Sequence, residues 1–99
     1  MEPDDHERLG KAIALFLTAV DRFPDNQPAK HVCLSFIGTL SASLFQLFGS
    51  LKSLDIAIKA TSSAVEITPD GHPDMLKILS KLGSFFGLRF ECLGELEDL

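Results

Sequence analysis

Twenty consecutive residues, from Val32 to Leu51, carry no charged side chain and read VCLSFIGTLSASLFQLFGSL. A helix of about 20 apolar residues is long enough to cross a lipid bilayer. A helix that is apolar on nearly all sides can also be the central helix of a soluble core. Any fold of this chain must therefore place the segment either in a membrane or against other helices.

Several features favour the soluble alternative. Serine, threonine and glutamine dilute the hydrophobicity of the segment, and no Trp or Tyr marks an interfacial belt at either end. The N-terminal sequence, MEPDDHERLG, is acidic and lacks the apolar core of a signal peptide. We therefore expect a cytoplasmic protein. The alternative is a membrane-associated helical protein that uses Val32–Leu51 as a transmembrane or membrane-surface segment.

The chain contains an internal repeat with a period of 45 residues. Residues 11–54 align without a gap with residues 56–99, and 14 of the 44 aligned positions are identical. Self-similarity at a fixed period is typical of proteins that stack one supersecondary unit several times. The residues in register include those that most restrict the backbone: Pro24/Pro69, Asp25/Asp70, Pro28/Pro73, Gly38/Gly83 and Gly49/Gly94.

Each copy is predicted to contain two helices. Apolar residues recur at three- and four-residue steps, which predicts helices over about 5–23, 29–48, 51–68 and 74–93. The prolines of PDNQP and PDGHP end the preceding helices, because two prolines so close together cannot both lie in a helix interior. Gly49 and Gly94 are predicted to end the helices before them. The expected fold is all-α: one domain over residues 1–99, with about four helices stacked as antiparallel pairs in a short α-solenoid.

The two copies differ in charge, which bears on the membrane alternative. Between residues 77 and 91, the helix predicted over 74–93 carries charges at four positions where its counterpart over 29–48 is uncharged. Lipid-facing positions would not accept that exchange. A stack of helices would accept the exchange. An inner helix is covered on both sides, whereas a terminal helix keeps one face exposed to solvent. The charged residues are Lys77, Lys81, Arg89 and Glu91, opposite Val32, Phe36, Leu44 and Gln46.

Composition argues against several classes of function. The formal net charge is −5 and no basic stripe is present, so a nucleic-acid surface is not expected. Cys33 and Cys92 lie far apart in apolar sequence and are predicted to be buried free thiols. The chain shows no spacing typical of a disulfide framework.

No catalytic, cofactor or metal site is predicted. The histidines His6, His31 and His72 show no recognisable metal-ligand spacing. His72 lies in the PDGHP turn, where a turn or capping role is expected. No nucleophile–base constellation and no glycine-rich phosphate loop can be identified. A third hypothesis, a small enzyme or ligand binder that uses the helical core, is therefore supported by no set of residues. We expect a protein that is not an enzyme.

Five short segments of the repeat carry a family resemblance: Ile37-Gly38, Leu54-Asp55-x-Ala57-Ile58, Ala64-Val65-Glu66, Pro69 and Leu82-Gly83. With them the chain resembles the tetratricopeptide repeat family over nearly its whole length. The period is longer than the family's usual one of about 34 residues, so the chain is similar to long-repeat variants such as the tandem arrays of large fungal proteins. Those arrays often flank a signalling ATPase or a caspase-like protease domain, and these 99 residues contain neither.

The resemblance implies roles for the small residues and for one proline. In this family small residues let two antiparallel helices pack closely, and the proline ends the second helix of a pair. Carried over by position, these repeat-packing residues are Gly38, Ala57, Ala64, Pro69 and Gly83.

The resemblance also implies a binding groove. The first helix of each pair lines the concave face of such arrays, which here means the helices over 29–48 and 74–93. Lys77 and Lys81 lie four residues apart on one face and resemble the basic pair that holds a peptide's terminal carboxylate in some members. In those members a polar amide side chain also helps to hold the carboxylate, and Phe36 occupies the corresponding position here. The implied function is a protein–protein interaction scaffold that binds a protein or peptide segment through Ser35, Phe36, Thr39, Ser43, Lys77, Ser80, Lys81, Ser84 and Leu88.

The phase of the repeat is unusual. The chain begins with a helix of the second type, holds one full unit over about 29–68, and continues with a helix of the first type. Repeat arrays normally need about three repeats and polar caps. We therefore expect a fragment of a longer array, a truncated gene product, or a chain that covers its open ends by self-association. Leu96 and Leu99 would lie unburied at one such end.

Overall fold

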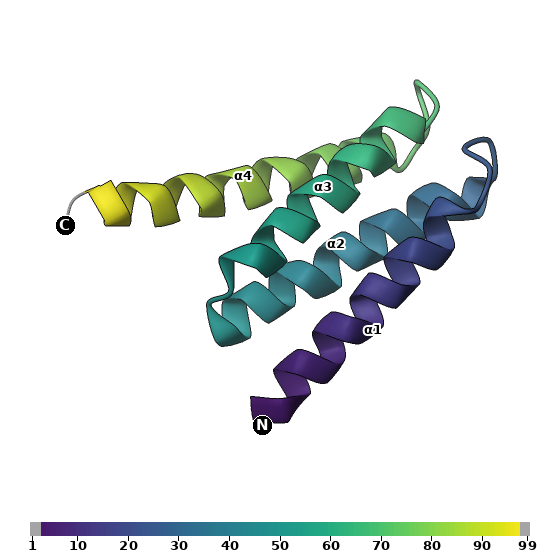
Figure 1. The fold of residues 1–99 in the computed structure, drawn as a ribbon. Helices are drawn as coiled ribbons and strands as arrows, with labels where there is room; N and C mark the ends of the chain where they lie inside the picture. The colour runs from purple at the N-terminus through teal and green to yellow at the C-terminus, as the bar shows by residue number, and fades with distance from the viewer. Residues whose placement is uncertain (1–2, 98–99) are drawn as a thin grey trace.

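The computed structural model describes residues 3–97 of the chain. It consists of α1 (Pro3–Asp21), α2 (Pro28–Phe48), α3 (Leu51–Ile67) and α4 (Met75–Glu97), and no strand occurs within the described residues (Figure 1). The all-α prediction with four helices is confirmed. The predicted ends also agree within two residues, except at the C-terminal end of α4.

The prediction that Gly94 ends the fourth helix is wrong. α4 continues through Gly94 to Glu97, whereas its counterpart Gly49 does end α2 with left-handed dihedrals of φ 72° and ψ 16°. Glycine permits the left-handed conformation but does not require it. After Gly49 the chain must turn at once, because Ser50 caps α3 by accepting a hydrogen bond from the N–H of Ser53. Glu95 follows Gly94 in the sequence, where Ser50 follows Gly49.

The two proline turns begin and end helices for a local reason. Pro28 is the first residue of α2, where its missing N–H costs no hydrogen bond. Thr68 is extended, with φ −76° and ψ 126°, as expected for a residue that precedes proline. Both its N–H and its hydroxyl donate to the carbonyl of Ala64, so the last turn of α3 is closed before Pro69.

α2 is the central helix of the molecule. It packs against α1 and α3 along its length and meets the N-terminal half of α4, while the C-terminal half of α4 extends away from the other helices (Figure 1). The uncharged segment of the sequence is therefore covered by helices on several sides. One core cluster joins all four helices through Ile13, Val20, Leu34, Ile37, Leu44, Ala60, Ala64 and Ile78. A second joins α2, α3 and α4 through Ala42, Leu54, Ala57, Ile58 and Phe85.

The closest approach between α2 and α3 is at Gly38. A Cβ atom built on Gly38 would overlap the hydroxyl of Thr61 and would lie 3.3 Å from the carbonyl oxygen of Ala57. Ala57 and Ala64 on α3 are fully buried. Small side chains at this crossing let the two backbones approach, so that α3 covers the central part of α2.

α2 is also long and apolar enough to cross a membrane, and among the described residues it is the only helix that is. Core helices of soluble proteins have the same length and composition. Nine of its residues are buried in the fold. Hydropathy alone is therefore weak support for the membrane alternative.

Candidate functional site

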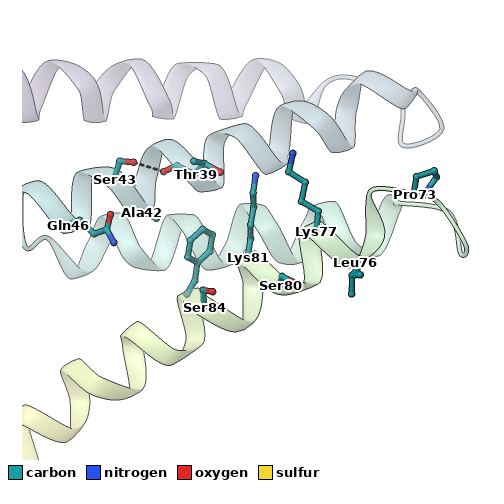
Figure 2. Close-up of a pocket in the computed structure, with 11 residues that line it drawn as sticks. Thr39, Ala42, Ser43, Gln46, Pro73, Leu76, Lys77, Ser80, Lys81 and Ser84 are labelled. Atoms are coloured by element: carbon teal, nitrogen blue, oxygen red, sulfur yellow. Dashed lines mark hydrogen bonds between the residues drawn. The ribbon is translucent and has the colours of Figure 1, made fainter.

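A groove of about 720 Å³ lies between α2 and the first half of α4 (Figure 2). A volume of this size is typical of ligand sites, which span roughly 300–1,000 Å³. α2 contributes hydroxyl groups and α4 contributes hydroxyl and ammonium groups to its walls. Six of the nine predicted groove residues line it: Thr39, Ser43, Lys77, Ser80, Lys81 and Ser84.

The two lysines dominate the electrostatics of this groove. Lys77 and Lys81 extend from α4 toward α2, whereas the neighbouring Leu76 points away from it (Figure 2). The Lys81 ammonium donates a hydrogen bond to the hydroxyl of Ser35 at 3.2 Å. Partial burial, and to a lesser degree the positive charge of Lys77, lower the pKa of Lys81. The site therefore holds two ammonium groups with no carboxylate among its lining residues.

A smaller hollow of about 180 Å³ adjoins the groove and shares both lysines. Ser35 and Phe36, two further predicted groove residues, line this hollow together with His31 and Asp74. Lys77 and Lys81 thus stand at the boundary between the two spaces. A ligand held by them can reach both.

Two predicted residues do not take their expected places. Leu88 lines neither space and instead packs against the second core cluster. Gly83 meets no described atom within 4 Å of a built Cβ, so the close approach predicted there does not occur. Leu96 and Leu99, predicted to be unburied, have side chains outside the described part of the structure.

Sequence reasoning missed several walls of the groove. Ala42 and Gln46 lie three residues after predicted residues of α2, and Phe85 lies four residues after Lys81. Helical spacing alone therefore places them on the same faces, and this signal could have identified them. The remaining lining residues, Pro73 and Leu76, lie at the end of the groove where α4 begins.

An apolar cavity of about 430 Å³ between α1 and α2 was also not predicted. It is lined almost entirely by hydrocarbon, and several of its side chains remain exposed. Phe36 and Ser43, which were predicted to line the peptide groove, also line this cavity, and no described helix covers this side. The lining comprises Leu9, Ala12, Ile13, Phe16, Phe36, Leu40, Ser43, Leu44 and Leu47.

The structure gives His72 the capping role predicted for it. Its Nδ1 accepts a hydrogen bond from the backbone N–H of Asp74 at 3.0 Å, just before α4 begins.

The structure also brings together residues that the sequence did not connect. The His31 and His72 rings lie edge to face at 4.8 Å, and Asp74 lies beside both. Cys33 and Cys92 are free, as predicted, and both are partly buried rather than fully buried.

The groove has both polar and apolar walls. Lys77 and Lys81 bring ammonium groups from α4, and Ala42 and Phe85 add apolar side chains. The hydroxyls of Thr39 and Ser43 donate hydrogen bonds to carbonyls of α2 itself. No family model matches the chain, and no curated protein or solved structure matches it significantly.

Proposed function

We propose that this protein is a non-enzymatic, cytoplasmic interaction module of the tetratricopeptide-like, α-solenoid kind. Its partner is a protein or peptide segment that binds in the groove between α2 and α4. The observation that carries the proposal is the pair Lys77 and Lys81, which line this groove side by side without an acidic partner among the lining residues.

The properties of Lys81 indicate the chemistry of the partner. Its lowered pKa means that burial and Lys77 together disfavour the charged ammonium. A carboxylate placed between the two lysines would offset both effects, and charge-assisted hydrogen bonds to a carboxylate are the stronger kind. We infer that the segment carries an acidic side chain or a free C-terminal carboxylate, with an apolar residue beside it.

Replacing both lysines, Lys77→Ala with Lys81→Ala, is expected to weaken the binding of acidic peptides at least about tenfold, because two charge-assisted bonds are lost. The probes are short fluorescent peptides that end in Glu or Asp, each made with a free C-terminal carboxylate and with an amide. Fluorescence anisotropy gives the dissociation constants. The affinity of the unmodified chain should also fall as salt is raised.

The matched control is Lys52→Ala with Lys59→Ala, two exposed lysines of α3 that change the net charge equally. Equal weakening by both double variants would mean that only net charge matters, and the proposal would then be wrong. Absence of binding to any acidic peptide would also contradict it.

Exposed apolar side chains support association with a second copy or a partner. On α4, Leu79, Phe86, Phe90 and Leu93 remain exposed, and groups of exposed apolar residues of this kind mark interaction surfaces. Size-exclusion chromatography with light scattering in detergent-free buffer is expected to give a soluble particle of defined mass that increases with concentration. A strictly monomeric particle would contradict self-association. Aggregation that only detergent reverses would favour the membrane alternative built on α2.

A further inference from the structure

We propose that His31, His72 and Asp74 form a binding site for a divalent transition metal, and that Zn²⁺ is the ion they fit best. The three residues come from different parts of the fold: the first turn of α2, the turn over 69–73 and the residue before α4. Each offers one ligand atom, and these atoms all lie within 4.8 Å of one another.

The geometry is that of a half-buried pocket rather than a surface cluster. The His31 side chain is only 6% exposed, whereas His72 and Asp74 open toward solvent at 31% and 46%. The Nε2 of His31 lies 3.3 Å from Oδ2 of Asp74, and the Nδ1 of His72 lies 3.9 Å from the same oxygen. One carboxylate oxygen thus stands between two imidazole nitrogens.

The shortest of these separations fits a tetrahedral ion. Zinc bonds of about 2.0–2.2 Å to nitrogen and oxygen place neighbouring ligand atoms of a tetrahedron about 3.4 Å apart. Bonds of the same length in an octahedron would place them about 3.0 Å apart. The 3.3 Å between His31 and Asp74 is close to the tetrahedral value, and the 3.9 Å between His72 and Asp74 must shorten by about half an ångström. The two histidine nitrogens, which lie within 4.8 Å of each other, must approach by as much as about 1.4 Å. Two imidazoles with one carboxylate suit Zn²⁺ and exclude Ca²⁺ and Mg²⁺, which prefer oxygen ligands.

Binding requires two local exchanges of partner. The Nδ1 lone pair of His72 must leave the N–H of Asp74, which lies at the solvent-facing start of α4. On His31, the metal takes the place of the contact between Nε2 and Oδ2 of Asp74. A cavity of about 230 Å³ beside His31 and His72 leaves room for water as the fourth ligand.

The neighbouring charges do not prevent cation binding. Asp25 and Lys30 both lie near the first proline turn, but Lys30 is already held by the Asp25 carboxylate at 2.7 Å and by the Phe23 carbonyl at 2.9 Å. Lys77 and Lys81 both line the hollow that Asp74 shares, and their charges oppose the cation. Lys77 is exposed, so water screens its charge. The Lys81 ammonium is held by the hydroxyl of Ser35.

The internal repeat provides the test variants. In the first copy Gln27 stands opposite His72 and Ala29 stands opposite Asp74, so the first turn lacks both ligands that the second turn supplies. His72→Gln installs the residue of the first copy. His31→Gln and Asp74→Asn keep the size of the side chains. The controls are His6→Gln, for a histidine that stacks on Phe48, and Asp70→Asn, for a carboxylate of the same turn.

The probe is Zn²⁺ added to the full chain, followed by isothermal titration calorimetry and thermal unfolding. We expect one Zn²⁺ per chain, a rise in the melting temperature, and at least about a tenfold loss of affinity in each of the three ligand variants. The two controls should bind Zn²⁺ like the unmodified chain. Co²⁺ should give an absorption spectrum without a thiolate charge-transfer band, since neither cysteine belongs to the site.

Three results would overturn the proposal. One is the absence of saturable Zn²⁺ binding by the unmodified chain. Another is unchanged affinity in His72→Gln and His31→Gln while their circular dichroism remains that of the folded chain. The last is a thiolate band with Co²⁺ that disappears in Cys33→Ser or Cys92→Ser, which would assign the metal to a cysteine.

Discussion

Replacement of Gly38 by leucine is expected to lower the free energy of unfolding by about 3 kcal/mol, the upper part of the range for overpacked sites. A Cβ at this position already overlaps the Thr61 hydroxyl and approaches the Ala57 carbonyl to 3.3 Å. The Phe85 ring lies 3.6 Å away on another side. A longer side chain would have to push α3 away from α2, and with it much of the second core cluster.

The internal repeat supplies the matched control for Gly38. Gly83 occupies the corresponding position, but a Cβ there meets nothing within 4 Å. Gly83→Leu should therefore stabilise the chain by roughly 0.8 kcal/mol, because leucine is the better helix former. Urea denaturation measures both changes as shifts of the midpoint at constant slope. Equal effects of the two substitutions would contradict the close crossing at Gly38.

A smaller pair of substitutions tests the contact itself. Gly38→Ala places only a Cβ against Thr61, so its loss should be smaller than that of Gly38→Leu. Thr61→Ala removes the oxygen that the new Cβ would meet, and this oxygen has no hydrogen-bond partner among the described residues. The double variant is therefore expected to be more stable than the sum of the two single changes predicts. Simple additivity would mean that the two positions do not touch.

The helices were predictable because their signals are local. Pro28 and Pro69 restrict their own backbone and that of the residue before them, and the apolar periodicity is contained within each helix. Gly49 and Gly94 show the limit of such signals. The same residue type ended α2, where Ser50 follows and caps α3, but not α4, where Glu95 follows.

The candidate sites were only partly predictable, for a different reason. Lys77 and Lys81 were found because they are neighbours on one helix. Leu88 was misplaced because its surroundings depend on the angle at which α4 meets the other helices, which no local pattern encodes. His31 and Asp74 lie 43 residues apart, and only the packing of the turn before α4 against the start of α2 brings them together.

Leu34→Ala is expected to cost about 3 kcal/mol, within the 2–5 kcal/mol range for buried leucines. Leu34 is 1% exposed and belongs to the cluster that joins all four helices. The corresponding residue, Leu79, is 45% exposed, so Leu79→Ala should cost about 1 kcal/mol or less. In this size range 1 kcal/mol moves the melting temperature by about 4–8 °C, so thermal unfolding separates the two variants.

The comparison of Leu34 with Leu79 also reports on what covers α4. At low protein concentration the described chain leaves Leu79 half exposed, and the two losses should differ by about 2 kcal/mol. If a second copy covers α4, the loss for Leu79→Ala should grow as the concentration rises, while that for Leu34→Ala stays constant. Equal losses at every concentration would contradict the observed asymmetry between the two copies. The repeat would then be symmetric in packing as well as in sequence.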